Sequence, residues 1–209
     1  ELKDQHGAWL MLDEAHSTGV MGPEGRGLAA QLALGSRIEV RMGTLGKALG
    51  ASGGFIAGSR SLIDLLVNRA RSFIFSTAPV PAAAAAATAA LELMITRDGE
   101  EARHQLRSVA AAGARVVNRA FQEPLGSAPS EGFVGHILPV LVGDEAAAVA
   151  LADRLRVAGV WVPAIRHPTV ARGSARLRLT FSAAHTAADL DCLDEAFNRA
   201  CIQTPPTPF

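Results

Sequence analysis

The sequence has very little cysteine. Its two cysteines, Cys192 and Cys201, are nine positions apart on one expected helix, which is too far for a disulfide bridge. They also lack the spacing of metal ligands, so we expect neither a disulfide framework nor a metal site. A chain without structural disulfides is typical of a reducing compartment, which predicts a cytoplasmic location.

Long apolar runs and an excess of either charge are absent as well. No stretch approaches the roughly 18 apolar residues of a membrane-spanning helix, and no signal-peptide pattern is present. The 20 basic and 20 acidic residues cancel, which argues against a protein that binds nucleic acid or a membrane surface through bulk charge. With 49% hydrophobic and 19% charged residues, the composition is that of a globular protein.

The first half of the chain alternates apolar runs with glycine-rich turns. The runs at 8–12, 38–42 and 53–58 predict buried strands, and the spacing that follows predicts helices over 60–70 and 81–96. We interpret the alanine run 82–87 as a close-packed core helix, because alanine favours helix and lets neighbours approach. The first residue is Glu1 rather than methionine, so we expect an excerpt of a longer protein.

The second half predicts a smaller α+β unit. We expect strands at 137–142, 160–162 and 177–180, and helices with N-caps at Asp98 and Asp144 and a capping box formed by Thr186 and Asp189. The first helix ends at Pro124, and the second stops at Gly159. The apolar faces expected on the first and last helices comprise Leu106, Val109, Ala110, Gly113, Val116, Val117, Ala120 and Phe121, and Leu190, Leu193, Phe197 and Cys201. The predicted domains are therefore 1–95 and 96–209, with a frayed tail at 204–209.

Asp13 and His16 follow the first predicted strand, at the position where α/β proteins bind ligands. A solvated loop is an equally good interpretation of this pair alone. The four residues 13–16 also spell a helicase ATPase motif, but that motif requires a preceding phosphate-binding loop, and Gly46-Lys47 is followed by Ala48. A metal site at Asp13 and His16 lacks a third ligand nearby.

Lys47 lies between two predicted strands, among glycine and apolar residues and without charged neighbours. The alternative is an ordinary surface lysine, but we expect these surroundings to desolvate the amine and make it a nucleophile. Thr44 precedes it with a hydroxyl that can bind phosphate. Arg166, Arg176 and Arg178 offer a bidentate grip on a carboxylate, although alternation alone could make the last two a solvated face. An acid, a lysine and an arginine are what pyridoxal phosphate catalysis on amino acids requires.

Several segments together resemble the α-oxoamine synthases. They are Leu12 to Val20 with Gly25 to Gly27, Thr44 to Gly50, Phe75 to Ala78, and Pro168 to Val170 leading to Gly173 to Leu179. The resemblance covers nearly the whole chain. It implies an α/β, type I pyridoxal-phosphate-dependent transferase fold: part of the large mixed-sheet domain, followed by a C-terminal α+β small domain. It also implies a homodimer with its active site at the subunit interface, which condenses an amino acid with an acyl thioester and releases carbon dioxide.

The resemblance also implies roles for individual residues. Lys47 forms the Schiff base with pyridoxal 5'-phosphate, Asp13 binds the pyridine nitrogen, and His16 binds the ring's phenolic oxygen. Thr44 touches the phosphate, and Ser76 or Thr77 reaches the phosphate of the neighbouring subunit's cofactor. Arg166 and Arg178 are the candidates for the substrate carboxylate, with Thr169 near the substrate.

Within that family, residues 164–170 are most similar to the members that make a biotin precursor from L-alanine and a pimeloyl thioester of coenzyme A or acyl-carrier protein. The stretch Gly43 to Gly54 is equally similar to members that acetylate glycine, and members that use glycine or serine with other thioesters share every motif. Two features depart from the family. Ala171 stands where proline is usual, and family members are nearly twice as long, so we expect residues 1–209 to be inactive alone.

Overall fold

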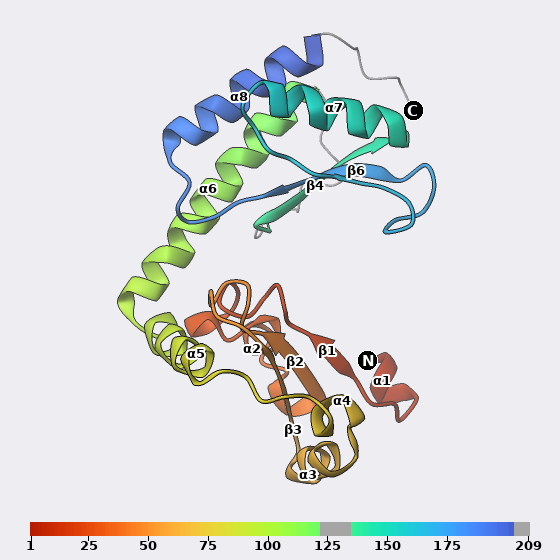
Figure 1. The fold of residues 1–209 in the computed structure, drawn as a ribbon, viewed down its shortest axis with the longest axis vertical. Helices are drawn as coiled ribbons and strands as arrows, with labels where there is room; N and C mark the ends of the chain where they lie inside the picture. The colour runs from red at the N-terminus through yellow and green to blue at the C-terminus, as the bar shows by residue number, and fades with distance from the viewer. Residues whose placement is uncertain (122–134, 203–209) are drawn as a thin grey trace. The chain divides into compact units, whose positions relative to one another are not determined.

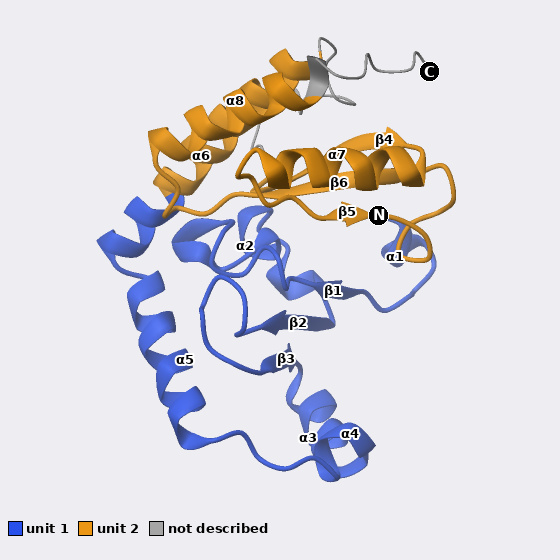
Figure 2. Ribbon diagram, turned by 45° about the horizontal axis from the view of Figure 1, so that its top comes forward, with its two compact units in different colours: residues 1–103 blue, residues 104–209 orange. Residues whose placement is uncertain are grey.

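The computed structural model describes residues 1–121 and 135–202, and the chain divides into two compact units, Glu1–Arg103 and His104–Phe209 (Figure 2). The division falls inside helix α6 (Arg97–Phe121), which begins at the end of the first unit and continues into the second. The domain boundary predicted between residues 95 and 96 stays a prediction about the whole protein. No helix of the described residues is both long and apolar enough to cross a membrane.

Unit 1 is built on a three-stranded mixed sheet with the order β1-β2-β3 (Figure 1). Strand β1 (Met11–Asp13) runs parallel to β2 (Val40–Thr44), with Asp13 opposite Met42, and β2 runs antiparallel to β3 (Gly54–Gly58). The three predicted strands of the first half are therefore confirmed, with bounds shifted by up to three residues. The parallel pair places the turn after β1 and the loop after β2 at the same edge of the sheet.

The prediction that these strands are buried is wrong. Met11 is 58% exposed, and Phe55 and Ile56 of β3 are exposed too. The reason is that strand side chains point to the two faces of the sheet, and few described elements of unit 1 pack on those faces beside β1 and β3. An apolar run indicates that a strand tends to be buried, but burial itself requires other elements that pack on the faces of the sheet.

The helices of unit 1 are mostly short. The predicted helix over 60–70 is confirmed as α3 (Arg60–Arg69), whose N-cap Ser59 accepts a hydrogen bond from the Leu62 N–H at 3.2 Å. The predicted helix over 81–96 is α5 (Pro81–Met94), but Ala87 is its only buried residue, so its interpretation as a core helix is wrong. Alanine favours helix whether or not it is buried. The other elements are α1 (Leu2–Gln5), α2 (Leu28–Gln31), α4 (Arg71–Ile74) and the 3₁₀ turns Pro23–Gly25 and Gly35–Arg37.

Helix α6 begins two residues earlier than an N-cap at Asp98 predicts, so Asp98 lies in its first turn and is not the N-cap. Thr96 takes that place: its Oγ1 accepts from the Gly99 N–H at 3.4 Å, and its carbonyl accepts from the Glu100 N–H at 3.1 Å. A threonine and an aspartate two positions apart are both good caps, so the sequence alone does not separate them. The predicted apolar face is confirmed, with Val109, Ala110, Val116 and Val117 buried. Pro124 lies outside the described residues.

Unit 2 packs helices on one face of a second three-stranded sheet with the order β4-β6-β5 (Figure 1). Its strands are β4 (Ile137–Gly143), β5 (Ala164–Ile165) and β6 (Ala175–Thr180), and β6 is antiparallel to both neighbours. Helices α6, α7 (Glu145–Val157) and α8 (Ala187–Ile202) supply the rest of the core. Its largest fully buried side chains are Phe197, Leu155, Leu177, Val117 and Val140.

The strand predicted at 160–162 is wrong. The short strand lies later, at Ala164–Ile165, and the Pro163 carbonyl accepts a hydrogen bond from the Arg178 N–H at 3.0 Å. Trp161 is 80% exposed, although a valine-tryptophan-valine run favours a strand. The reason is register, because β6 offers its hydrogen bonds to residues 163–165 and not to the run before them.

Both predicted caps of unit 2 are confirmed. Asp144 accepts from the Ala147 N–H at 2.8 Å at the start of α7. Thr186 and Asp189 bond each other reciprocally: the Thr186 N–H donates to Asp189 Oδ2 at 2.7 Å, and the Asp189 N–H donates to Thr186 Oγ1 at 3.3 Å. Leu193 and Phe197 of α8 are buried as predicted. Cys192 is a free, exposed thiol, whereas the side chain of Cys201 and the tail at 204–209 lie outside the described residues.

We predict that Gly113→Ala destabilises unit 2. A Cβ atom at Gly113 would lie 2.2 Å from the Phe181 ring, far inside van der Waals contact. Overpacking of this kind costs about 1–3 kcal/mol, which exceeds the helix propensity gained from alanine. Thermal unfolding of the intact protein should show a clearly lower Tm. Ser108→Ala, at an exposed position of the same helix, is the control and should leave Tm nearly unchanged.

We predict that Asp189→Asn lowers stability at neutral pH and that its effect fades in acid. The backbone N–H of Thr186, and next its hydroxyl, hold the pKa of the Asp189 carboxyl below its ordinary value of 3.8. A lowered folded-state pKa stabilises the protein above that ordinary value, and the contribution is lost as pH falls through the lowered pKa. Tm measured from pH 7 to pH 3 should therefore converge for variant and wild type. A constant difference, or an equal effect from Asp191→Asn, would contradict this assignment.

Candidate functional site

The turn after β1 brings two of the predicted site residues to the edge of the sheet. Asp13 is the last residue of β1 and is exposed, and its Oδ1 accepts from the Ala15 N–H at 2.8 Å. The Glu14 N–H continues the pairing with β2 by donating to the Met42 carbonyl at 2.8 Å. The chain then turns, which places His16 three residues beyond Asp13 on the same turn.

The loop that joins β2 to β3 carries Lys47 and is folded by its own backbone. The Leu45 N–H donates to Gly53 O at 2.9 Å, and the Ala51 N–H donates to Leu45 O at 2.8 Å. Ala48 packs so closely on the turn after β1 that a Cβ atom at Gly19 would lie 2.8 Å from the Ala48 Cβ. Gly19 also has φ +82°, so glycine is required there on both counts.

This packing brings the amine of Lys47 to the imidazole of His16. Lys47 Nζ lies 3.1 Å from His16 Nε2, and the protonation state and tautomer decide which group donates. Lys47 is exposed, so the prediction that apolar neighbours desolvate it is wrong for this structure. Of its neighbours, Leu49 is buried, whereas Gly46 and Ala48 are exposed, so the amine stays at the surface beside the imidazole.

The hydroxyl of Thr44, at the end of β2, is engaged within the same loop. It donates to Gly53 O at 3.1 Å and accepts from the Gly46 N–H at 3.2 Å. Thr44 therefore helps to fix the loop that carries Lys47. To donate to a phosphate, its hydroxyl would have to break the hydrogen bond to Gly53 O.

Ser76 and Thr77 lie just after α4, in an exposed segment. The Ser76 hydroxyl donates to the Ser72 carbonyl, within a turn where Arg71 also covers the Phe75 ring at 5.3 Å. In this structure the hydrogen-bond partner of Ser76 is therefore local, the carbonyl of Ser72.

The remaining predicted residues belong to unit 2. Arg176 and Arg178 alternate along β6 with buried Leu177 and Leu179, so they lie on the face of the sheet opposite the helices. Arg176 Nε donates to the Ser174 carbonyl at 3.0 Å. Among the described residues the guanidinium of Arg178 has neither a hydrogen bond nor an ion pair, which leaves it available to a ligand. Arg166 and Thr169 are exposed in the segment after β5.

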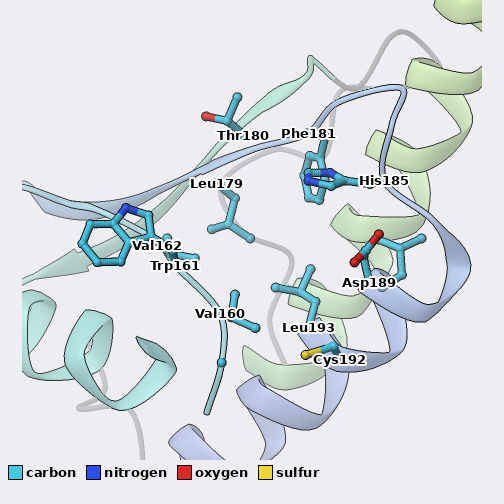
Figure 3. A pocket seen from close by; sticks show the side chains of 12 residues that line it. Val160, Trp161, Val162, Leu179, Thr180, Phe181, His185, Asp189, Cys192 and Leu193 are labelled. Carbon is cyan, nitrogen blue, oxygen red and sulfur yellow. The ribbon is translucent and has the colours of Figure 1, made fainter. Parts of the chain in front are cut away.

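A hollow of about 300 Å³ in unit 2 lies away from these residues (Figure 3). Trp161, His185, Asp189 and Cys192 are among the side chains that line it. Two of its polar groups are already in use, because His185 Nδ1 accepts from the Ser182 N–H at 3.2 Å and Asp189 caps α8, whereas Cys192 is a free thiol. Of the residues that the structure describes, no three histidine, cysteine, aspartate or glutamate side chains are grouped to hold a metal ion.

Comparisons with known proteins show the family to which this chain belongs. The family model for aminotransferases of class I and II matches residues 1–197. The 8-amino-7-oxononanoate synthase of Anaeromyxobacter dehalogenans, strain 2CP-1, is 47% identical over 206 residues, which cover 99% of this chain and 50% of that protein. The chain thus spans about half the length of the curated relatives that it matches.

Solved structures give the same fold. A serine palmitoyltransferase variant from S. paucimobilis, solved with a PLP–myriocin aldimine, is 27% identical with a TM-score of 0.81, and the match covers 97% of this chain and 49% of that one. The 8-amino-7-oxononanoate synthase of Francisella tularensis is 25% identical with a TM-score of 0.74, over 93% of this chain and 54% of that one. The two units are thus part of a type I PLP-dependent transferase fold. Together with the match over 1–197, this establishes that the chain belongs to the class I and II aminotransferase family.

Proposed function

We propose that the protein uses pyridoxal 5'-phosphate to join L-alanine to a pimeloyl thioester with loss of carbon dioxide, as an 8-amino-7-oxononanoate synthase. The observation that carries the proposal is the Lys47–His16 pair, 3.1 Å apart at the edge where Asp13 ends the neighbouring strand. Curated relatives with that name are 47% and 48% identical to this chain. The proposal concerns the whole protein, of whose relatives' length this chain spans about half.

The residues at this edge fit the cofactor chemically. When bound, the cofactor supplies an electron-accepting ring that stabilises negative charge at the α carbon of an amino acid. An exposed primary amine at Lys47 can bond its aldehyde carbon. Asp13 keeps one carboxylate oxygen beyond the one that accepts from Ala15, and this oxygen can hold a proton on the ring nitrogen. His16 can bond the phenolic oxygen from beside Lys47.

The hydroxyls differ in how well they suit a phosphate. A phosphate oxygen accepts hydrogen bonds, and both Thr44 and Ser76 already donate their proton to carbonyls, Gly53 O and Ser72 O. Thr77 is exposed beside Ser76. We therefore favour Thr77 over Ser76 as the residue that reaches the phosphate of a neighbouring subunit's cofactor, and we assign Thr44 a contact that requires its hydroxyl to rotate.

The protein's own groups then divide the proton chemistry between them. Lys47 Nζ would hold the cofactor, and once the substrate's own amino group displaces it, the freed amine would take the proton from the substrate α carbon. His16 Nε2, within hydrogen-bond distance, can accept or return a proton at Nζ. Asp13 keeps the ring nitrogen protonated. In unit 2, Arg178 offers a fork of N–H donors to the substrate carboxylate, with Arg166 and Thr169 as further candidates.

A homodimer with the active site at the subunit interface and a cytoplasmic location complete the proposal. The runner-up is a glycine C-acetyltransferase, since residues 43–54 suit both activities equally. We expect residues 1–209 alone to be inactive.

We predict that Lys47→Ala abolishes covalent attachment of the cofactor. In the intact wild-type protein, pyridoxal 5'-phosphate should give a visible absorption band, and borohydride reduction should fix the label on the peptide that contains Lys47. The variant should show neither, and its turnover should fall at least about 1,000-fold because nucleophile and base are both lost. Lys3→Ala is the control and should label normally. Retained label or turnover in Lys47→Ala would rule out the role of this lysine.

We predict that the intact protein turns over L-alanine with a pimeloyl thioester much faster than it turns over glycine with acetyl-CoA. Steady-state assays should compare kcat/KM for alanine, glycine and serine, each with both thioesters. A preference for glycine and acetyl-CoA would replace the proposed substrates with those of the acetyltransferase, while leaving the cofactor chemistry in place.

A further inference from the structure

Glu14 is a buried carboxylate in the middle of the candidate site. Strand alternation turns it inward where its neighbour Asp13 turns outward, and it is only 5% exposed. Its Oε1 accepts from the Ala29 N–H of α2 at 3.0 Å and from the Ser17 hydroxyl at 3.2 Å. A carboxylate at such depth is stable only because donors surround it.

The backbone of Glu14 makes further bonds at the same point, among them one from the Ser17 hydroxyl to its carbonyl at 3.4 Å. Its N–H donates to Met42 O at 2.8 Å, and its carbonyl accepts from the Ser17 N–H at 3.0 Å and the Thr18 N–H at 2.9 Å. One residue therefore joins strand β2, helix α2 and the turn that carries His16.

Gly27 is shaped for this carboxylate. A Cβ atom there would lie 2.3 Å from Glu14 Oε1, and the φ of +95° also favours glycine. The chain before α2 thus leaves room for the carboxylate, and the bond from the Ala29 N–H ties the turn to α2.

We infer that Glu14 is a positioning residue for the reaction proposed above: its carboxylate fixes the turn that carries Asp13 and His16 against the loop that carries Lys47. The inference rests on the proposed function. Glu14 has no contact with the reacting atoms and acts through the orientation of its neighbours. Loss of a supporting residue of this kind lowers activity by about 10- to 100-fold in other sites.

The test compares Glu14→Ala with Glu14→Gln and Glu24→Gln in the intact protein. Glu14→Gln keeps an acceptor oxygen on a side chain of the same length. Glu24→Gln changes an exposed acid of the same segment, which is paired with Arg26. Three quantities are measured: hydrogen exchange of the amides of Ser17, Thr18 and Ala29 without cofactor, visible circular dichroism of bound pyridoxal 5'-phosphate, and kcat and KM separately.

We expect Glu14→Ala to speed exchange at these amides, to reduce the visible dichroism of bound cofactor, and to lower kcat about 10- to 100-fold with KM for the amino acid nearly unchanged. Glu14→Gln should restore all three to within about threefold, and Glu24→Gln should match wild type. Should Glu14→Ala fail to fold, Ser17→Ala, which removes one donor only, should show the same changes in weaker form.

Unchanged dichroism and kcat in Glu14→Ala would overturn the inference, as would a Glu14→Gln variant as impaired as Glu14→Ala. Failure of the proposed function gives a different result: the wild type itself shows no visible band with pyridoxal 5'-phosphate. In that case the exchange measurement still decides whether Glu14 fixes the turn, and unchanged exchange in Glu14→Ala would refute it.

Discussion

The candidate site depends on the parallel pairing of β1 with β2. In a parallel pair both strands end at the same edge, so residues 29 or more positions apart in sequence arrive together. Asp13 ends one strand opposite Met42, and the chain that leaves the other strand reaches Lys47 soon afterwards. An antiparallel pairing of the same two segments would place Asp13 and Lys47 at opposite ends of the sheet. The third strand, antiparallel to β2, then closes the Lys47 loop back on the same edge.

The loops at this edge are held by close packing at glycines, by hydrogen bonds and by the buried side chains of Glu14 and Leu49. Gly19 lets Ala48 approach, Gly27 leaves room for Glu14, and Thr44 bridges both sides of the Lys47 loop. Small residues and main-chain hydrogen bonds can fix a turn while its functional groups stay exposed. Asp13, His16 and Lys47 are all exposed at the surface of the described chain, where a ligand can reach them.

The sequence predicts the elements of this chain better than their surroundings. Helix α3, the apolar face of α6 and both caps of unit 2 follow from spacing and capping chemistry, which are local. Burial depends on what else packs against a segment, so the alanine-rich α5 and the strands β1 and β3 are more exposed than their composition suggests. Strand position depends on the partner's register, and for this reason the strand beside β6 begins after Trp161 instead of including it.

The sequence by itself determined which candidate functional groups are present and in what order: an acid and a histidine at the end of one strand, a lysine after the next, and arginines on a later strand. This order resembles that of a known family. The family match over residues 1–197 shows the family itself. Only the tertiary structure decided that Lys47 contacts His16 and that the Lys47 amine is exposed. It also decided that the hydroxyls of Thr44 and Ser76 donate hydrogen bonds to backbone carbonyls. It alone revealed Glu14 as the residue that joins three elements, because a hydrogen bond between a side chain and a backbone amide fifteen residues away leaves no periodic pattern in a sequence.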